Sequence, residues 1–342
     1  MRKHRVALIG LGMAVAPHAK SLLDLKDRVE VAYAFSPSAA RRKAFTEKFP
    51  FPLCDRLDTI LNDKSIDCVE ILTPPNTHLD LVRQCAAAGK HILLEKPLEV
   101  STERAVALVE AAAKAGVTLG VMLQHRFRPA GMKLRAMLRG GELGKIVGCS
   151  TMIRLWRPQS YYDVEGRGTK ARDGGGVLIT QGIHTLDLML SLAGPIAEVT
   201  GYAATSSVHR METEDMVTAA VRFANGALGT IDATTGAYPG FPERVEIIGE
   251  KATASLVGGD LTVAHHDGRV TEMKTEFGAG GTGADPMAFP HDWHCGAIAD
   301  FLDAIDERRA PTVSGAEALN VHRLIDALLE AGASGKRVTV AS

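Results

Sequence analysis

The first third of the chain alternates short apolar runs with longer amphipathic segments. This alternation is typical of repeated βα units, in which parallel strands are connected by helices that cover the sheet. The predicted strands span residues 6–9, 29–35, 68–72, 91–94 and 118–123, and the predicted helices span 14–25, 39–48, 77–88 and 102–115. Ser38 and Ser101 stand where N-caps belong, and Gly89 and Gly116 stand where helices end.

Beyond residue 144 the pattern changes to longer alternating runs. These predicted strands span 145–157, 199–207, 216–224, 227–235, 244–249 and 253–257. Asn225-Gly226 is a strong signal for a tight hairpin between two of them, so we expect an antiparallel sheet. A helix over 174–188 interrupts the strands, and helices over 292–307 and 315–333 follow a glycine-rich loop at 278–283. The pattern therefore predicts an α/β protein.

Two domains are expected from the length of 342 residues and from this change of pattern. The first, over residues 1–124, is a dinucleotide-binding Rossmann domain, which is a doubly wound parallel sheet. The second, over residues 125–342, is an α+β domain with a mainly antiparallel sheet. Its last helix is a candidate to pack back on the first domain.

Composition excludes several classes of partner. A formal net charge of -1 argues against nucleic acid or an anionic membrane, because both demand a basic face. Five cysteines without C-x-x-C pairing suit reduced thiols in a cytoplasmic protein. The basic N-terminus leads into a strand rather than a signal peptide, and we expect no stretch that spans a bilayer. A small-molecule partner is therefore expected.

A partial dinucleotide fingerprint follows the first strand, in Gly10-Leu11-Gly12-Met13-Ala14-Val15. Gly10 allows a tight turn, and Gly12 lets backbone N–H groups and the positive helix end approach a pyrophosphate, with Met13 beside them. Val15 replaces the third glycine, so a simple tight turn is the alternative.

The end of the second strand bears on the choice of nicotinamide cofactor. NAD-selective sheets usually place a carboxylate there for the ribose 2′-hydroxyl, but this chain has Ser36 and Ser38, with Arg41 or Arg42 one helical turn later. Hydroxyl and guanidinium donors suit a 2′-phosphate, so NADP(H) is favoured and NAD(H) is possible. Alternatively, Ser38 only caps the next helix and the arginines are solvated.

Two further loops follow buried strands and should lie at the same carboxyl edge of the sheet, where open α/β sheets bind ligands. One contains Thr73, Pro74, Asn76 and His78, and the other is Glu95-Lys96-Pro97. An ordinary turn and a surface lysine are the alternatives.

The segment Gly174-Gly175-Gly176 precedes the predicted helix of 174–188, which places Thr180, His184 and Asp187 at i, i+4 and i+7 on one face. Glycines there allow a ligand or another main chain to approach closely. A single histidine on such a helix is commonly a hydrogen-bonded core residue, but Lys96 supplies a partner for catalysis.

These motifs together resemble the glucose-fructose oxidoreductase, inositol dehydrogenase and MocA family. The resemblance covers nearly the whole length, from Gly10-Leu11-Gly12 through Thr73–His78, Glu95-Lys96-Pro97 and His184-Thr185-Leu186-Asp187 to the segment 300–305. It implies a Rossmann domain joined to a domain with a large open sheet, often used for dimer or tetramer assembly. It also implies hydride transfer between a nicotinamide and a carbinol carbon of a sugar, polyol or related compound.

The resemblance also implies roles for individual residues. Lys96 would touch the reacting hydroxyl and the nicotinamide ribose, and His184 would be the general acid/base. Many relatives have Asp where this chain has Thr180, which can orient neighbours or bind substrate but cannot relay a proton. Alcohol oxidation needs a general base such as His184, because the hydroxyl proton must leave as the hydride departs. The ammonium of Lys96 would stabilise the alkoxide that develops on the substrate. Asp187 could orient His184, or pair with an arginine instead.

Candidate substrate residues precede the catalytic helix. They are Gln124, Arg126, Trp156, Arg157, Tyr161, Arg167 and Arg172, with Thr180 and His184. Tyr and Trp suit sugars, and the arginines suit a carboxylate or phosphate, unless they are solvated surface charges. We therefore expect a homodimeric or homotetrameric oxidoreductase for a sugar, polyol or sugar acid.

Two rival functions and one weaker motif remain. A cofactor-binding sensor that performs no chemistry is disfavoured by the presence of both Lys96 and His184. A glycosidase that retains its cofactor is the second rival. His291 and His294 are spaced i, i+3, but no third ligand is assignable, so no metal is expected.

Overall fold

A computed structural model describes residues 3–275 and 290–341 of the chain. It divides into two compact units, Met1–Gln124 with His291–Leu319, and His125–Pro290 with Asn320–Ser342. The sequence-based division had placed every residue after 124 in the second domain. Residues 291–319 belong to the first unit because α10 (Asp292–Glu307) packs on α1 (Val15–Asp24) and on the last two strands of its sheet, which run over residues 91–95 and 119–122.

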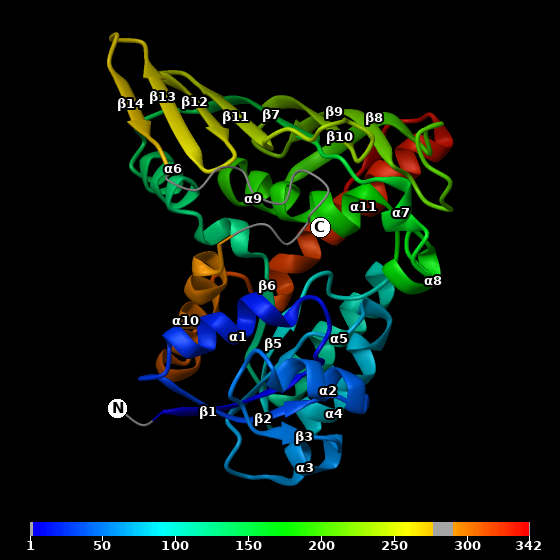
Figure 1. Cartoon of the computed structure of the whole chain (residues 1–342). Helices are drawn as coiled ribbons and strands as arrows, with labels where there is room; N and C mark the ends of the chain where they lie inside the picture. The colour runs from blue at the N-terminus through cyan, green and yellow to red at the C-terminus, as the bar shows by residue number, and fades with distance from the viewer. Residues whose placement is uncertain (1–2, 276–289, 342) are drawn as a thin grey trace. The chain divides into compact units, whose positions relative to one another are not determined.

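The first unit contains a six-stranded parallel sheet in the order β3-β2-β1-β4-β5-β6 (Figure 1). Its strands are β1 (His4–Ile9), β2 (Val29–Phe35), β3 (Leu53–Cys54), β4 (Cys68–Ile71), β5 (His91–Glu95) and β6 (Leu119–Met122). The connecting helices are α2 (Ala39–Thr46), α3 (Leu57–Asn62), α4 (His78–Ala87) and α5 (Thr102–Ala115). This is the predicted doubly wound sheet, and its strand order reverses between β1 and β4.

Local signals predicted most of these elements to within two residues, and β2 and α5 have the predicted bounds. Ser38 and Ser101 accept hydrogen bonds from the backbone N–H of Arg41 and Arg104, as N-caps do. Gly116 ends α5 at φ 68°. Analysis of the sequence missed β3 and α3, because a two-residue edge strand and a six-residue helix are too short to show a period.

The second unit contains a nine-stranded sheet in the order β14-β13-β12-β11-β7-β10-β9-β8-β15 (Figure 1). Its strands are β7 (Ile146–Arg154), β8 (Ile196–Ala204), β9 (Met216–Phe223), β10 (Leu228–Thr234), β11 (Arg244–Gly249), β12 (Ala252–Val257), β13 (Asp260–His265), β14 (Val270–Met273) and β15 (Val338–Thr339). All neighbours are antiparallel except β7 and β10, which confirms the mainly antiparallel prediction. The predicted hairpin at Asn225-Gly226 joins β9 to β10, with Gly226 at φ 90°.

Helices cover one face of this sheet. Its helices are α6 (Pro129–Arg139), α7 (Gln159–Tyr162), α8 (Lys170–Asp173), α9 (Ile183–Ala193) and the later part of α11 (Gly315–Ser334). Of these, α9 packs on β7 and β11, and α6 packs on β12 and β13. Residues of β9 are alternately exposed and buried, so the opposite face is open. Analysis of the sequence did not predict α6, β13 and β14, and its glycine-rich loop at 278–283 lies outside the described residues.

The predicted helix of 174–188 is not continuous. Gly174 has φ 82°, a π-helical turn spans Leu178–Gly182, and α9 begins only at Ile183. A Cβ on Gly176 would lie 1.7 Å from the carbonyl oxygen of Glu214, so this glycine makes room for another main chain. The assumption of a constant helical period was therefore wrong over this segment, because a π turn inserts a residue into the helical repeat.

One stretch, Lys170–Ala193, has the length and mean hydropathy of a membrane span, but glycines and charged residues interrupt it, as the sequence-based expectation requires. Within its most apolar window, 72% is buried inside the structure. That burial is typical of a core helix in a globular protein.

Candidate functional site

The Gly10 turn lies at the carboxyl end of β1, next to the point where the strand order reverses. Gly10 has φ +107°, and a Cβ there would lie 2.9 Å from the carbonyl group of Leu72, which follows β4. No atom lies within 4 Å of a Cβ built on Gly12, and the side chain of Met13 is 59% exposed. This bare backbone at the start of α1 fits a dinucleotide pyrophosphate, which needs close approach to N–H groups.

Ser36 and Ser38, at the end of β2, were candidates either to bind a cofactor phosphate or to make local hydrogen bonds. Ser36 is buried and its Oγ accepts from the backbone N–H of Ser38, while the Oγ of Ser38 caps α2. Arg42 donates to the carbonyl of Ser36 at 2.6 Å, whereas the side chain of Arg41 is exposed. The capping alternative for Ser38 is therefore correct, and Arg41 is the arginine in this loop that is available to a ligand.

His78 braces the two loops that follow β4 and β5. Its Nε2 lies 2.8 Å from the carbonyl oxygen of Thr73, and its Nδ1 lies 3.0 Å from that of Pro97. The ring is completely buried, and that burial lowers the pKa of His78. We conclude that His78 holds the Thr73 and Lys96 loops together rather than facing a ligand.

The remaining residues of the first loop form a small hydroxyl network. Thr73 Oγ1 and Thr77 Oγ1 are 2.7 Å apart, and Thr77 Oγ1 also donates to the carbonyl of Pro74. Pro74 and Asn76 are exposed, so this loop presents a stiff polar rim beside the Gly10 turn.

Lys96 follows β5, at the same edge of the sheet, and is joined to Pro97 by a cis peptide bond. Glu95, predicted to bind the cofactor, instead points into the interior of the unit and is buried. One of its oxygens accepts from the backbone N–H of Lys96 at 3.0 Å, and the other lies 2.9 Å from His18 on α1. Gln124, after β6, is buried in the same unit.

His184 lies in the first turn of α9, in the second unit, with its ring 4.9 Å from that of His125. Asp187 is completely buried, and Arg126 donates to both of its oxygens, at 2.8 and 2.6 Å. The alternative of an arginine partner for Asp187 is therefore correct. Because Arg126 is committed to this ion pair, its charge is neutralised for any substrate anion.

Thr180 lies in the π turn and donates to the carbonyl of Gly176 at 2.6 Å, with Gln181 as a second close partner. Lys96 belongs to the first unit, and Thr180 and His184 belong to the second. The catalytic pairing of Lys96 with His184 therefore stays a prediction.

A polar and aromatic group lies beside this turn. The hydroxyl of Tyr161 accepts from Arg167 at 2.9 Å and from Gln181 at 3.3 Å, and the Arg167 guanidinium lies 4.8 Å from the centre of the Tyr161 ring. Analysis of the sequence missed Gln181, although it directly follows Thr180. This group presents the hydrogen-bonding donors and ring face that a sugar needs.

The other predicted substrate residues have mainly internal partners. Arg157 is 2% exposed and donates to the carbonyl of Trp156, whose ring packs edge-on against Tyr238. Arg172 bonds the carbonyl of Glu165 within its own loop. These arginines stabilise the loops before α9, and Arg167 is the better candidate for an anionic group.

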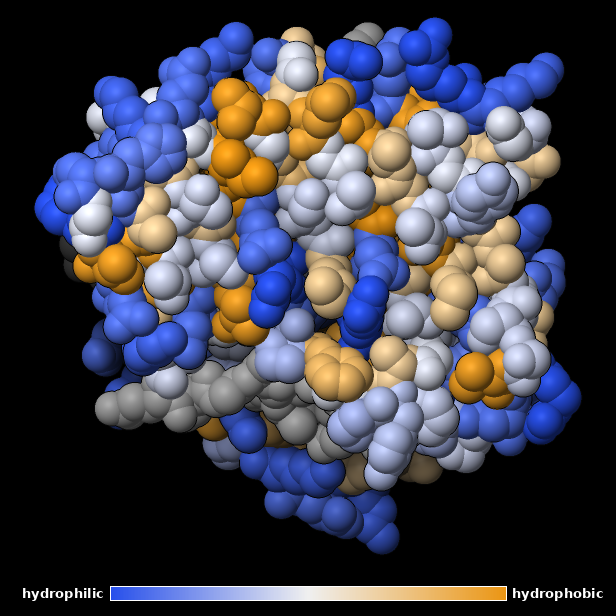
Figure 2. Space-filling model, turned by 90° about the horizontal axis from the view of Figure 1, so that it is seen from above, coloured by the Kyte–Doolittle hydropathy of each residue, from blue (hydrophilic) through white to orange (hydrophobic). Residues whose placement is uncertain are grey.

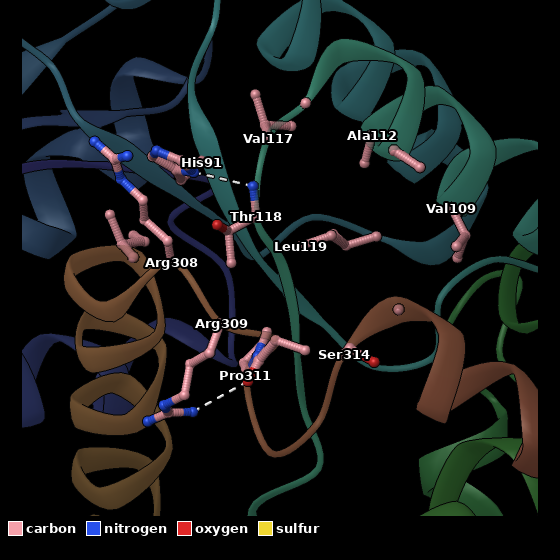
Figure 3. Close-up of a pocket in the computed structure, with 15 residues that line it drawn as sticks. His91, Val109, Ala112, Val117, Thr118, Leu119, Arg308, Arg309, Pro311 and Ser314 are labelled. Atoms are coloured by element: carbon pink, nitrogen blue, oxygen red, sulfur yellow. Dashed lines mark hydrogen bonds between the residues drawn. The ribbon is translucent and has the colours of Figure 1, made fainter.

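A cavity of about 570 Å³ lies at the opposite edge of the parallel sheet, where β5 and β6 begin (Figure 3). His91 accepts from the backbone N–H of Thr118 on its wall, and Arg308 and Arg309 border it. Because it lies at the amino ends of the strands, it is not the predicted cofactor edge.

His291 and His294, noted in the sequence for their i, i+3 spacing, have different neighbours. His294 groups with His18 and Glu95, and one nitrogen or oxygen of each lies within 4.8 Å of the others. His291 contacts Asp24 at 2.7 Å. Both imidazoles of the group and its carboxylate are buried. Analysis of the sequence missed His18, although it lies on the apolar side of α1 with Val15, Ala19 and Leu22.

Comparison with known families decides the classification. The family described as "Oxidoreductase family, NAD-binding Rossmann fold" matches residues 4–123, and "GFO/IDH/MocA C-terminal domain" matches residues 132–255. The chain belongs to the GFO/IDH/MocA family. It is therefore an oxidoreductase with an NAD-binding Rossmann domain.

Relatives in this family cover nearly the whole chain. A scyllo-inositol 2-dehydrogenase (NAD(+)) of Bacillus subtilis is 26% identical and the alignment covers 92% of this chain and 90% of that protein. A D-xylose 1-dehydrogenase (NADP(+)) of Haloferax volcanii is 25% identical, with 90% and 91% covered. The structure of the WlbA dehydrogenase of Bordetella pertussis, solved with NADH and UDP-GlcNAcA, has a TM-score of 0.84 at 27% identity, with 100% of both chains covered.

Proposed function

We propose that this member of the GFO/IDH/MocA family transfers hydride between NADP(H) or NAD(H) and a secondary alcohol or carbonyl of a sugar, polyol or sugar acid. The observation that carries the proposal is the arrangement at the carboxyl edge of the parallel sheet. There the Gly10 turn, the Thr73 loop and Lys96 follow three adjacent strands, β1, β4 and β5. The similar inositol, xylose and nucleotide-sugar dehydrogenases support the substrate class.

Each catalytic residue has a distinct role in the proposal. His184 takes the hydroxyl proton during oxidation, because an imidazole titrates near neutrality. The ammonium of Lys96 stabilises the negative charge that develops on the substrate oxygen. The nicotinamide, when bound, accepts or supplies the hydride. Thr180 has no ionisable group and orients the turn before His184, through its bond to Gly176.

The catalytic pair is tested with Lys96→Ala and His184→Ala, assayed by the absorbance of reduced nicotinamide against inositols, aldoses and uronates. We expect turnover to fall by about 10²-fold or more in both variants, since general acid–base groups contribute 10²–10⁴-fold. Dinucleotide binding by His184→Ala should survive, because His184 lies outside the Rossmann unit. Lys114→Ala, which removes an exposed lysine of α5, is the control. Normal turnover in both test variants refutes the assignment.

The proposed preference for NADP(H) depends on Arg41. Its side chain is exposed at the tip of β2, and no carboxylate follows Phe35 directly to hold a ribose 2′-hydroxyl. We expect Arg41→Ala to raise KM for NADP about tenfold and to leave KM for NAD nearly unchanged, since loss of a charge-assisted bond costs about 1.5–3 kcal/mol. Steady-state kinetics with both cofactors measures this. Equal effects on the two cofactors would leave the preference without support.

A sugar acid is the substrate subclass that Arg167 supports. Its guanidinium donates to the Tyr161 hydroxyl and lies over the Tyr161 ring, whereas the guanidinium of Arg126 is paired with the carboxylate of Asp187. The UDP-GlcNAcA bound by the similar WlbA enzyme is also a sugar acid. The same absorbance screen tests this by comparing turnover of uronates with turnover of the matching neutral sugars. Faster turnover of the uronates would support the sugar-acid subclass.

We also propose that the protein self-associates through the open face of the nine-stranded sheet. A cytoplasmic location is a separate part of the proposal. Exposed apolar side chains on that face belong to four strands, and Figure 2 views the molecule from this side. They are Tyr202, Met216, Leu228 and Ile248. All five cysteines are free thiols, which supports a reducing compartment.

A further inference from the structure

His18 lies between two carboxylates inside the first unit. Its Nδ1 is 2.6 Å from Glu70 Oε2 on β4, and its Nε2 is 2.9 Å from Glu95 Oε1 at the end of β5. His18 is completely buried, and the two glutamates are 2% and 9% exposed. Strands β4 and β5 are neighbours, so the imidazole on α1 connects two adjacent strands through one glutamate of each.

The hydrogen-bonding partners set the charge of the ring. An ionised carboxylate only accepts hydrogen bonds, so both ring nitrogens must donate, and only an imidazolium has two N–H groups. Burial by itself would lower the pKa of His18, but the hydrogen bonds and charges of Glu70 and Glu95 outweigh it and raise the pKa to about 9. The buried group is therefore charged at neutral pH.

His294 defines the other side of His18. The two rings are edge-on, with centroids 5.2 Å apart. Burial and the positive charge of His18 lower the pKa of His294 to about 3, so this second imidazole is neutral. A metal ion held by His18, Glu95 and His294 would have to replace the proton between His18 Nε2 and Glu95. The 2.9 Å contact of Nε2 with Glu95 Oε1 is a hydrogen-bond distance, which favours the proton.

Glu95 connects this buried cation to Lys96. Its Oε1 faces His18, and its Oε2 accepts from the backbone N–H of Lys96 at 3.0 Å. Burial would raise the pKa of Glu95, but the hydrogen bond and charge of His18, with smaller effects from His294 and Lys96, lower it. Since a charge interaction is reciprocal, an ionised Glu95 also favours the ammonium form of Lys96.

We propose that His18 is a positioning residue: held as an imidazolium by Glu70, it fixes the carboxylate of Glu95, which in turn fixes the Lys96 backbone and keeps its side chain an ammonium. Charges alternate along Glu70, His18, Glu95 and Lys96, so no buried charge lacks an opposite neighbour. This inference depends on the proposed function in one respect, which is the role of Lys96 toward the substrate.

The first test needs no substrate, and it uses variants only to assign signals. Protein labelled with ¹⁵N at its histidines is examined by NMR from pH 6 to pH 10. We expect His18 to show two protonated nitrogens up to about pH 9, while His294 in the same spectrum stays neutral throughout. Substitution of each histidine assigns its signals. A neutral His18 at pH 7 overturns the proposal, and so does stoichiometric bound metal in the purified protein.

The second test removes the charge of Glu95. Glu95→Gln keeps the size of the side chain, and the titration of Lys96 is followed by the ¹³Cε signal of labelled lysine. We expect its midpoint to move down by about one pH unit, the lower end of the effect of an adjacent opposite charge. The alkaline limb of the pH profile of kcat should move with it, while KM for the dinucleotide changes little.

Glu99→Gln is the matched control. Glu99 is a buried carboxylate of the same loop that bonds Arg104 and two backbone N–H groups, not Lys96. It should leave the Lys96 midpoint unchanged. Equal midpoints in wild type and Glu95→Gln overturn the proposal. If Lys96→Ala is fully active but these titrations behave as expected, the proposed function fails and the charge chain stands.

Discussion

Glycines at two positions of the chain serve different purposes that only their surroundings distinguish. A Cβ on Gly12 meets no atom within 4 Å, whereas one on Gly176 would lie 1.7 Å from the Glu214 carbonyl oxygen. Gly12 therefore leaves space for a ligand, and Gly176 leaves space for the protein's own backbone. Both were recognised in the sequence as places of close approach, but the approaching group could not be identified there.

Gly176→Ala is expected to destabilise the protein by about 3 kcal/mol or more, because the main chain of Glu214 cannot yield as a flexible side chain would. Thermal or urea unfolding measures the loss. Gly12→Ala is the contrasting variant: it should unfold like the wild type while binding dinucleotide more weakly, since its methyl group occupies open space. Equal stability of Gly176→Ala and wild type would contradict this account.

At the scale of elements, the fixed position of α9 depends on a buried ion pair. Arg126, in a short turn after β6, donates to both carboxylate oxygens of Asp187 in the middle of α9. Both side chains are at most 5% exposed, so bulk solvent hardly screens the pair. The helix that carries His184 is therefore anchored three residues beyond it.

Asp187→Asn should cost about 3–5 kcal/mol of unfolding free energy, because it removes the negative charge from a buried ion pair that Arg126 bonds at both oxygens. Chemical denaturation measures this. The matched control is Asp232→Asn, which breaks the pair with Arg154 on the sheet surface, where 48% of the arginine side chain and 29% of the aspartate side chain are exposed. That change should cost under about 1 kcal/mol. Similar losses in the two variants would show that burial is not the cause.

At the scale of the whole molecule, the open sheet face raises the question of assembly. Leu228 on β10 and Ile248 on β11 flank Gly148 of β7, to which both are registered, and their side chains are 56% and 51% exposed. Neighbouring exposed apolar residues on a wide, flat sheet are typical of a self-association surface.

Leu228→Glu combined with Ile248→Glu is expected to shift the protein toward monomer, because like charges would then meet across a symmetric interface. Light scattering after size-exclusion chromatography gives the mass. Val164→Glu, which changes an exposed valine in a loop of the same unit, controls for the added charge and should not alter the mass. A wild-type protein that is already monomeric would contradict the assembly proposal.

Local patterns in the sequence were enough to predict the longer strands and helices of both sheets, because hydrophobic period, capping serines and the Asn225-Gly226 turn act within a few residues. They did not predict the short β3 and α3, or α6, β13 and β14. The same patterns located Gly10, Lys96 and His184 on the right elements. Tertiary structure alone decided the partners of buried charges: Glu95 turned inward to His18, Asp187 paired with Arg126, and residues 291–319 joined the first unit. The partner of a buried charge depends on which distant segments pack together and exclude water around it. A local hydrophobic period carries no information about these distant contacts.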